Sequence, residues 1–174
     1  MLKKPLLLVG ISGAGKSTVG RLLAERFGVA FVDLDDWVEK EAGMTVGAVF
    51  DKLGQSRFRD LEALVLSRAL QSQPPAVIAT GGGAMIRTKN RVQARDQGCV
   101  IWLEVSPALA ASRCQHGIDR PLLRDGDAVG TLESLLAERA QGYEEASMVV
   151  QTDDCAPNDV VNRIVDALER GCSE

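Results

Sequence analysis

The stretch LLLVGISGAGKS, residues 6–17, decides the fold of this chain. Four apolar residues run directly into the pattern Gly-x-x-x-x-Gly-Lys-Ser, which is typical of a loop that wraps phosphate groups between a buried strand and a helix. Residues 16–27 predict that helix, because apolar side chains recur at helical spacing and a glycine follows: Val19, Leu22, Leu23, Phe27 and then Gly28. The motif and its flanks therefore indicate a site for a nucleoside triphosphate.

Each part of this loop has a chemical task. Gly13, Ala14 and Gly15 present backbone N–H groups to phosphate oxygens, and the start of the helix adds partial positive charge. Lys16 is expected to reach the β- and γ-phosphates, and the Ser17 hydroxyl is expected to ligate Mg²⁺. The alternative is a glycine-rich turn that merely links strand to helix.

The phosphate loop alone does not choose among kinases, GTPases and ATP-driven switches. A GTPase needs an Asn-Lys-x-Asp element that recognises guanine, and Thr88-Lys89-Asn90-Arg91 does not match it. Large ATPases need a longer chain than 174 residues. These exclusions favour a small kinase of the nucleoside-monophosphate-kinase type.

Length and composition indicate one globular domain over residues 1–174, with 45% apolar residues. The longest uncharged stretch, residues 69–86, contains Pro74-Pro75 and three glycines, so it does not predict a membrane helix. Lys3-Lys4 precede an apolar run that is too short for a signal peptide, and we expect a cytoplasmic protein. No coiled-coil heptads are visible, so a monomer is the default expectation.

The charges argue against a nucleic-acid partner. The chain has 20 Lys and Arg against 24 Asp and Glu, a net charge of −4, and no basic run longer than Lys3-Lys4.

A zinc site is not expected either, because the cysteines are far apart and His116 is the only histidine. We expect reduced cysteines that pack in the interior: Cys99, Cys114, Cys155 and Cys172.

Short apolar runs alternate with helix-like segments along the whole chain. This alternation predicts an α/β fold of three layers, α/β/α, in which helices cover both faces of a parallel sheet. The expected strands are residues 6–9, 30–32, 76–79, 100–103 and 148–150. The further expected helices are a short one from Thr45 to Gly54, a longer one over about 56–71, one that starts at Ser106-Pro107, and a last one capped by Asn158 and ended by Gly171.

Residues 115–130 fit neither a helical nor a strand period. We interpret them as a mobile lid, with an ordinary surface loop as the alternative. Arg120 and Pro121 lie within this segment, which suits a charge that is carried to the site when the lid closes.

Two carboxylates follow the second expected strand. If Asp33 and Asp35 continue the strand alternation, both side chains point to the same side, at the sheet edge where ligands bind in open α/β folds. Asp33 could hold Mg²⁺ through water, and Asp35 could accept a hydrogen bond from an attacking hydroxyl. The alternative is that Asp35 or Asp36 caps the next helix, and we expect this of Asp36.

Three further features could serve a second ligand. Gly81, Gly82 and Gly83 follow the third strand at the same edge and allow a ligand to approach the backbone closely, although a permissive turn is the alternative. Arg59 and Arg139 lie in helix-like segments, where the usual role of an arginine is a surface ion pair.

Taken together, these motifs resemble the shikimate kinase family over nearly the whole chain. The resemblance rests on their joint order and spacing: Gly10–Ser17 with Thr18, Asp33-x-Asp35, Phe58-Arg59-x-x-Glu62, Gly81–Gly83, Arg120-Pro121-Leu122-Leu123 and Arg139-x-x-x-Tyr143. It implies a P-loop kinase fold with a lid and a five-stranded parallel sheet in the order 2-3-1-4-5. It also implies phosphoryl transfer from MgATP to the 3-hydroxyl of shikimate.

The resemblance also implies roles for single residues. Asp35 would bind the acceptor hydroxyls and take the proton, while Arg59 and Arg139 would hold the shikimate carboxylate, as a guanidinium can through two parallel hydrogen bonds. The acceptor-binding helices would span about 33–62, and Gly81–Gly83 would line the shikimate pocket. On the ATP side, Thr18 would join the loop, Arg120 would reach the transferred phosphate, and Arg113, just after the helix that follows the fourth strand, would stack near the adenine.

Two other functions stay open from the residues. Ile11-Ser12 in the phosphate loop resembles gluconate kinases as much as shikimate kinases, so another small acceptor is possible. A protein that binds ATP as a regulatory module without phosphorylating a metabolite is the other alternative. Acceptor-stimulated ADP release distinguishes all three.

Overall fold

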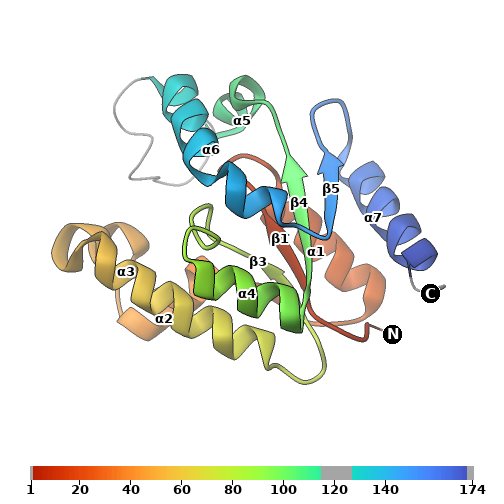
Figure 1. Cartoon of the computed structure of the whole chain (residues 1–174), viewed down its shortest axis with the longest axis horizontal. Helices are drawn as coiled ribbons and strands as arrows, with labels where there is room; N and C mark the ends of the chain where they lie inside the picture. The colour runs from red at the N-terminus through yellow and green to blue at the C-terminus, as the bar shows by residue number, and fades with distance from the viewer. Residues whose placement is uncertain (1, 115–126, 172–174) are drawn as a thin grey trace.

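The fold is built on a five-stranded parallel sheet in the order β2-β3-β1-β4-β5 (Figure 1). The structure is a computed structural model that describes residues 2–114 and 127–171. Its strands are β1 (Leu6–Val9), β2 (Phe31–Asp33), β3 (Val77–Ala79), β4 (Cys99–Glu104) and β5 (Met148–Gln151). The parallel sheet and the order 2-3-1-4-5 are confirmed.

The central strand β1 explains why its sequence is continuously apolar. All four of its residues are buried, because β1 pairs with β3 on one side and β4 on the other, with Leu6 opposite both Val77 and Cys99. The strand ends differ from the predicted ones by one residue in several places. The second strand is Phe31–Asp33 and not 30–32, although the Ala30 carbonyl still accepts a hydrogen bond from the Val77 N–H.

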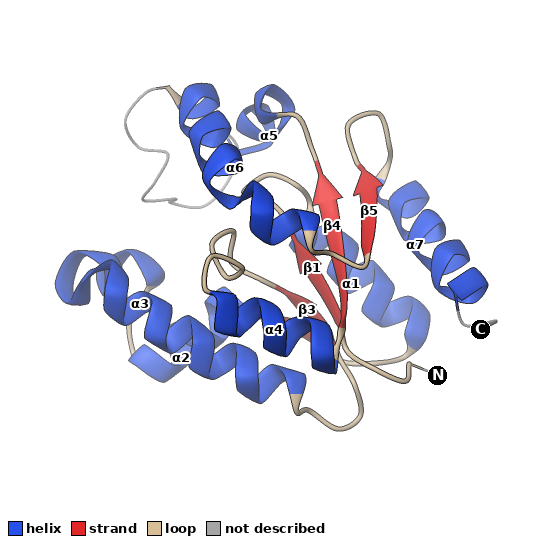
Figure 2. Ribbon diagram, viewed as in Figure 1, coloured by secondary structure: helices blue, strands red, loops and turns tan. Residues whose placement is uncertain are grey.

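Helices cover both faces of the sheet, which confirms the three-layer prediction. They are α1 (Lys16–Phe27), α2 (Leu34–Ala42), α3 (Val46–Leu70), α4 (Thr88–Gln97), α5 (Pro107–Cys114), α6 (Ala128–Glu144) and α7 (Pro157–Gly171). In Figure 2, α4 and α6 lie in front of the sheet, whereas α1 lies behind it beside α7. A continuous apolar core joins the strands to both helix layers.

Some helix predictions are confirmed and others are wrong. Helix α1 has the predicted bounds, and α5 begins at Pro107 as expected. The two helices expected over 45–71 are confirmed within α3, because Thr45 caps its start and the helix is interrupted at Gly54, whose φ of 79° and ψ of 167° are not helical. Helix α4 was not predicted, because its sequence is polar and buries only Asn90 and Ala94.

The expected caps and the expected lid end also need correction. Asn158 lies inside α7, which starts one residue earlier at Pro157. Residues 128–130 belong to α6, because the Asp127 side chain caps that helix by accepting a hydrogen bond from the Gly130 N–H. The rest of the predicted lid, residues 115–126 with Arg120 and His116, lies outside the described residues.

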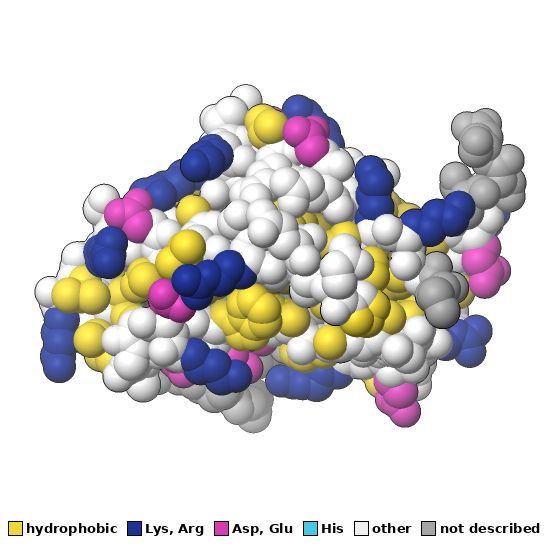
Figure 3. Space-filling model, turned by 90° about the horizontal axis from the view of Figure 1, so that it is seen from below, with side chains coloured by type: hydrophobic (Ala, Val, Ile, Leu, Met, Phe, Trp, Pro, Cys, Tyr) yellow, Lys and Arg dark blue, Asp and Glu magenta, His cyan; other side chains and the backbone are white. Residues whose placement is uncertain are grey.

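The surface carries charges of both signs. On the face in Figure 3, Lys and Arg side chains are scattered among acidic side chains and apolar areas. No helix in the described ranges is long and apolar enough to cross a membrane. The three described cysteines, Cys99, Cys114 and Cys155, are half-buried and form no disulfide.

Candidate active site

The phosphate loop connects β1 to α1 and forms one wall of a pocket of about 460 Å³. Gly13 and Gly15 have φ values of 84° and 89°, a left-handed backbone that favours glycine. A side chain at Gly13 would also lie 2.4 Å from the Ala110 carbonyl oxygen of α5. The predicted residues Gly13–Thr18 all line this pocket, which we call the phosphate pocket.

Lys16 is held over the loop that it belongs to. Its Nζ atom donates to the carbonyl oxygens of Gly10 at 2.8 Å and Ile11 at 2.9 Å. These bonds fold the side chain back across the loop, so that the ammonium group stays beside the N–H groups that a phosphate would meet. A polyphosphate in the loop would therefore have a cation beside it.

Ser17 and Asp33 lie together in the lining of the pocket. The Ser17 hydroxyl donates to Asp33 Oδ2 at 2.8 Å, and both residues line the phosphate pocket. Mg²⁺ is usually held by one or two protein oxygens, with phosphate oxygens and waters completing its octahedron. This hydroxyl and carboxylate fit that requirement, although the described residues contain no group of three His, Cys, Asp or Glu side chains that could hold a metal alone.

The two aspartates are arranged differently from the strand prediction. Asp33 ends β2 and is the N-cap of α2, where its side chain accepts a hydrogen bond from the Asp35 N–H at 3.2 Å. Asp36 is therefore not the cap, and Asp35 lies in the first turn of a helix and not on a strand. Both Asp33 and Asp35 still line the phosphate pocket, because the tight strand-to-helix junction brings them to the same edge.

Arg113 joins the phosphate loop to the loop after β5. It lies in the last turn of α5, not after the helix, and donates to the carbonyl oxygens of Gly13 at 3.3 Å and Thr152 at 3.0 Å. Next to Thr152, the Asp153 carboxylate accepts a hydrogen bond from the Ser106 N–H at 2.8 Å, and this bond lowers the pKa of Asp153. The loop after β5 is thus tied to the start of α5 and to the phosphate loop.

The triple glycine after β3 lies against charged side chains from three helices. A Cβ atom on Gly81 would lie 2.7 Å from Glu62 Oε1 and 3.0 Å from Asp35 Oδ1, and one on Gly82 would lie 2.9 Å from Arg139 Nη1. On Gly83 it would lie 2.3 Å from Arg59 Nη2. Glycine is therefore needed so that these charged groups can approach the loop.

Arg59, Glu62 and Arg139 form a buried charged cluster. Their residues are 7%, 1% and 6% exposed, so the surface ion pairs usual for helical arginines do not apply here. Arg59 Nη1 pairs with Glu62 Oε2 at 2.6 Å, one turn apart on α3. Glu62 Oε1 and Arg139 Nε are the two side-chain polar atoms that are buried without a hydrogen-bond partner in the described structure. Such groups cost free energy unless a ligand or water satisfies them.

Burial also shifts two pKa values beside this cluster. It raises the pKa of Glu62 from 4.5 to about 7, because loss of water outweighs the attraction of Arg59. It raises the pKa of Tyr143 from 10.0 to about 12, with Arg139 opposing the shift. At neutral pH, Tyr143 is therefore a hydrogen-bond donor, and Glu62 lies near the midpoint of its titration.

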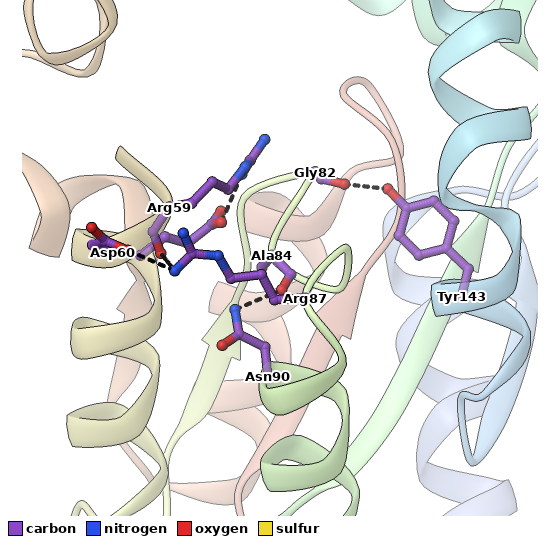
Figure 4. A network of polar contacts seen from close by, with 8 residues as sticks. Arg59, Asp60, Gly82, Ala84, Arg87, Asn90 and Tyr143 are labelled. Atoms are coloured by element: carbon purple, nitrogen blue, oxygen red, sulfur yellow. Dashed lines mark hydrogen bonds and ion pairs between the residues drawn. The ribbon is translucent and has the colours of Figure 1, made fainter. Parts of the chain in front are cut away.

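A network of hydrogen bonds holds the loop from Gly81 to Arg87 in place (Figure 4). Arg87 donates to the Arg59 carbonyl oxygen at 3.1 Å and pairs with Asp60 at 2.8 Å. The buried Asn90 amide donates to the Ala84 carbonyl oxygen at 2.8 Å, and the Tyr143 hydroxyl donates to the Gly82 carbonyl oxygen. The loop is thus fixed by α3, α4 and α6 together.

The predicted residues therefore gather in two adjoining places. Asp33, Asp35, Gly81, Gly82 and Arg113 line the phosphate pocket with the loop residues, whereas Arg59, Gly83 and Arg139 meet beside it. Two residues of these motifs have no role that the sequence predicts: Glu62 and Tyr143. Their spacing from arginines, i+3 after Arg59 and i+4 after Arg139, is the signal that could have placed them on the same helix faces.

Comparison with known proteins identifies the fold and the family. The family model described as shikimate kinase matches residues 12–169. A shikimate kinase of Symbiobacterium thermophilum is 46% identical over 170 residues, covering 95% of this chain and 97% of that protein. The structure of shikimate kinase from Acinetobacter baumannii in complex with shikimate is similar, with a TM-score of 0.92 and 34% identity over 97% of this chain and 94% of that one.

A gluconokinase from Sinorhizobium meliloti shares the fold with much less sequence similarity. Its TM-score is 0.62 at 20% identity, over 96% of this chain and 92% of that one. That likeness concerns the fold alone, whereas the family model and the close relatives concern nearly the whole sequence. The chain belongs to the shikimate kinase family.

Proposed function

We propose that this protein phosphorylates shikimate. It transfers the γ-phosphoryl group of ATP to the 3-hydroxyl and yields shikimate 3-phosphate and ADP, a step of the chorismate pathway to aromatic amino acids. The observation that carries this proposal is the junction of two sites at Gly81 and Gly82, which touch both the phosphate pocket and the buried charged cluster. A phosphate donor and a carboxylate-bearing acceptor would meet there.

On the donor side, the loop residues bind the phosphates of ATP. The N–H groups of Gly13, Ala14 and Gly15 contact phosphate oxygens, Lys16 neutralises the β- and γ-phosphates, and Thr18 adds a hydroxyl at the start of α1. Arg113 stacks near the adenine, which suits its position between the phosphate loop and the loop after β5. We also expect Arg120 to approach the transferred phosphate.

Mg²⁺ accompanies the ATP, with Ser17 as a direct ligand and Asp33 as a carboxylate that acts through water. When bound, the ion would neutralise charge on the β- and γ-phosphates. The hydrogen bond between Ser17 and Asp33 supports this assignment, because it already directs both oxygens to one point at the pocket wall.

On the acceptor side, Arg59 and Arg139 bind the carboxylate of shikimate. Two guanidinium groups in a nearly dry site suit a carboxylate, and Arg139 Nε has unmet hydrogen-bonding capacity. The backbone of Gly81–Gly83 lines the ring, since side chains at these positions would collide with the charged groups.

Asp35 accepts the proton of the 3-hydroxyl. Its carboxylate lies beside Gly81 and also lines the phosphate pocket, so an acceptor hydroxyl could reach both it and the γ-phosphate. As the oxygen forms its bond to phosphorus, the bond from phosphorus to the ADP oxygen breaks and the hydroxyl proton moves to Asp35. Positioning and charge neutralisation supply most of the rate enhancement.

We also propose that the protein is a single domain and a monomer, that it is located in the cytoplasm, and that its only substrates are small molecules. Gel filtration with light scattering tests the monomer, for which one chain has a mass of 18.6 kDa.

The experiment for the activity measures ADP release from MgATP with shikimate, gluconate, AMP or no acceptor. Release that depends on shikimate alone is the expected result. Release with gluconate or AMP would assign another acceptor, and nucleotide binding with no acceptor-stimulated release at all would favour the regulatory ATP-binding module.

A further inference from the structure

Tyr143 connects two groups of the acceptor site without being assigned to that site. It lies four residues after Arg139 on α6, so both side chains extend from the same face of the helix. Its hydroxyl donates to the carbonyl oxygen of Gly82, and Arg139 Nη1 faces the same glycine. The Arg139 guanidinium also interacts with the Tyr143 hydroxyl.

The Tyr143 side chain is closely packed. The residue is only 1% exposed, and its ring stacks on Trp102 of β4 with a centroid distance of 5.6 Å and an interplanar angle of 28°. Helix α6 itself lies close to the loop, since a Cβ atom on Gly142 would be 2.7 Å from the Met85 carbonyl oxygen. The hydroxyl therefore has a fixed position relative to the central sheet.

We propose that Tyr143 is a positioning residue for acceptor binding, whose hydroxyl sets the distance between the Gly82 backbone and the Arg139 guanidinium. In Figure 4 the side chain extends from α6 toward the glycine loop, and its hydroxyl meets the Gly82 carbonyl. The bond orients the peptide between Gly82 and Gly83 and thus the N–H of Gly83. This inference rests on the proposed function, because it assumes that Arg139 and the glycine loop bind the acceptor.

The direct test is Tyr143→Phe, which keeps the ring stacked on Trp102 and removes only the hydroxyl. We expect the KM for shikimate to rise about tenfold, because a buried carbonyl loses its partner and the loop relaxes. The kcat and the KM for ATP should change much less than the KM for shikimate, since the Tyr143 hydroxyl bonds to the carbonyl oxygen of Gly82 and the phosphates are bound by residues 13–18. A thermal melt of each variant confirms folding.

The matched control is Trp102→Phe, which disturbs the same aromatic stack from the strand side and leaves the hydroxyl in place. It is expected to lower the melting temperature with no selective change in the KM for shikimate. Equal changes in both variants, or an unchanged KM in Tyr143→Phe, would overturn the positioning role.

A second readout uses the fact that Tyr143 is the only tyrosine of the chain. Protein labelled with ¹³C at the tyrosine ζ carbon gives a single resonance for this residue. Shikimate alone should shift it, because the Arg139 guanidinium redistributes from the hydroxyl to the ligand carboxylate, whereas a non-hydrolysable ATP analogue alone should not. If shikimate binds and the resonance does not move, the inference is wrong. If the wild-type enzyme does not use shikimate at all, the proposed function fails instead.

Discussion

The two halves of the candidate active site are constructed in opposite ways. The phosphate-binding groups of the phosphate pocket come from one contiguous loop, in which backbone groups and a single lysine lie within eight residues of each other. The buried charged cluster takes its side chains from α3 and α6, about 80 residues apart, and places them against a third segment after β3. The first half depends on local conformation, whereas the second depends on tertiary packing.

This difference predicts how each half responds to substitution. Loss of a charge in the open phosphate pocket should impair chemistry with little effect on folding. Loss of a charge in the buried cluster should affect acceptor binding and stability together, because its partner is left buried and unpaired.

The largest effect is expected for Lys16→Ala. The variant should lose about 10³-fold in kcat, because a preorganised cation at the β- and γ-phosphates is removed. Its melting temperature should stay near the wild-type value, since the bonds from its ammonium group to the Gly10 and Ile11 carbonyl oxygens lie within one loop. Steady-state kinetics and a thermal melt measure both.

The control for this variant is Lys89→Ala, which removes an exposed lysine on α4. Its kinetics should equal those of the wild type. Near-native activity in Lys16→Ala would show that the phosphate loop does not work as proposed.

The same contrast explains how much could be predicted from the sequence. The phosphate loop, α1 and the sheet order follow from a contiguous motif, the resemblance that it supports and the regular alternation of apolar runs. The roles of Glu62 and Tyr143 do not follow from local patterns, because burial and proximity to Gly81 and Gly82 arise only when α3 and α6 pack on the sheet. Asp33 is predicted to serve a metal but also caps α2, because the helix begins at Leu34, directly after the strand.

The second prediction concerns Arg59→Ala. The KM for shikimate should rise about 100-fold, because one of two guanidinium groups for the carboxylate is lost, while the KM for ATP should change by less than about threefold. Stability should also fall, since Glu62 loses its partner at 2.6 Å. Initial rates with each substrate varied separately give the two KM values.

Two further variants sharpen this result. Arg59→Ala combined with Glu62→Gln removes the unpaired buried charge and should recover part of the stability but not the KM for shikimate. Arg68→Ala, on the same helix, breaks an ion pair with Glu41, and the Arg68 side chain is 55% exposed. This variant should change the unfolding free energy by less than about 1 kcal/mol. A similar rise in both KM values for Arg59→Ala would remove this residue from the acceptor site.

The smallest expected effect is a pH dependence of the unfolding free energy. It comes from the buried charged cluster and not from the phosphate pocket. Burial raises the pKa of Glu62 in the folded protein from 4.5 to about 7, so between these values the folded state binds a proton that the unfolded state has released. The contribution of Glu62 to stability is complete below pH 4.5 and is lost as the pH rises through 7. The slope from this one group is at most about 1.4 kcal/mol per pH unit.

Urea unfolding between pH 4.5 and 8 measures this slope in the wild type and in Glu62→Gln, where it should be absent. Asp60→Asn is the matched control, because this neighbouring carboxylate on α3 is 51% exposed and pairs with Arg87. It should keep the wild-type slope. If Glu62→Gln also keeps the wild-type slope, the group that titrates is another residue. Glu62 Oε1 would then need a hydrogen bond that stabilises the charged carboxylate. In that case Glu62 would remain ionised at neutral pH and would serve as a fixed counter-charge to Arg59 and Arg139.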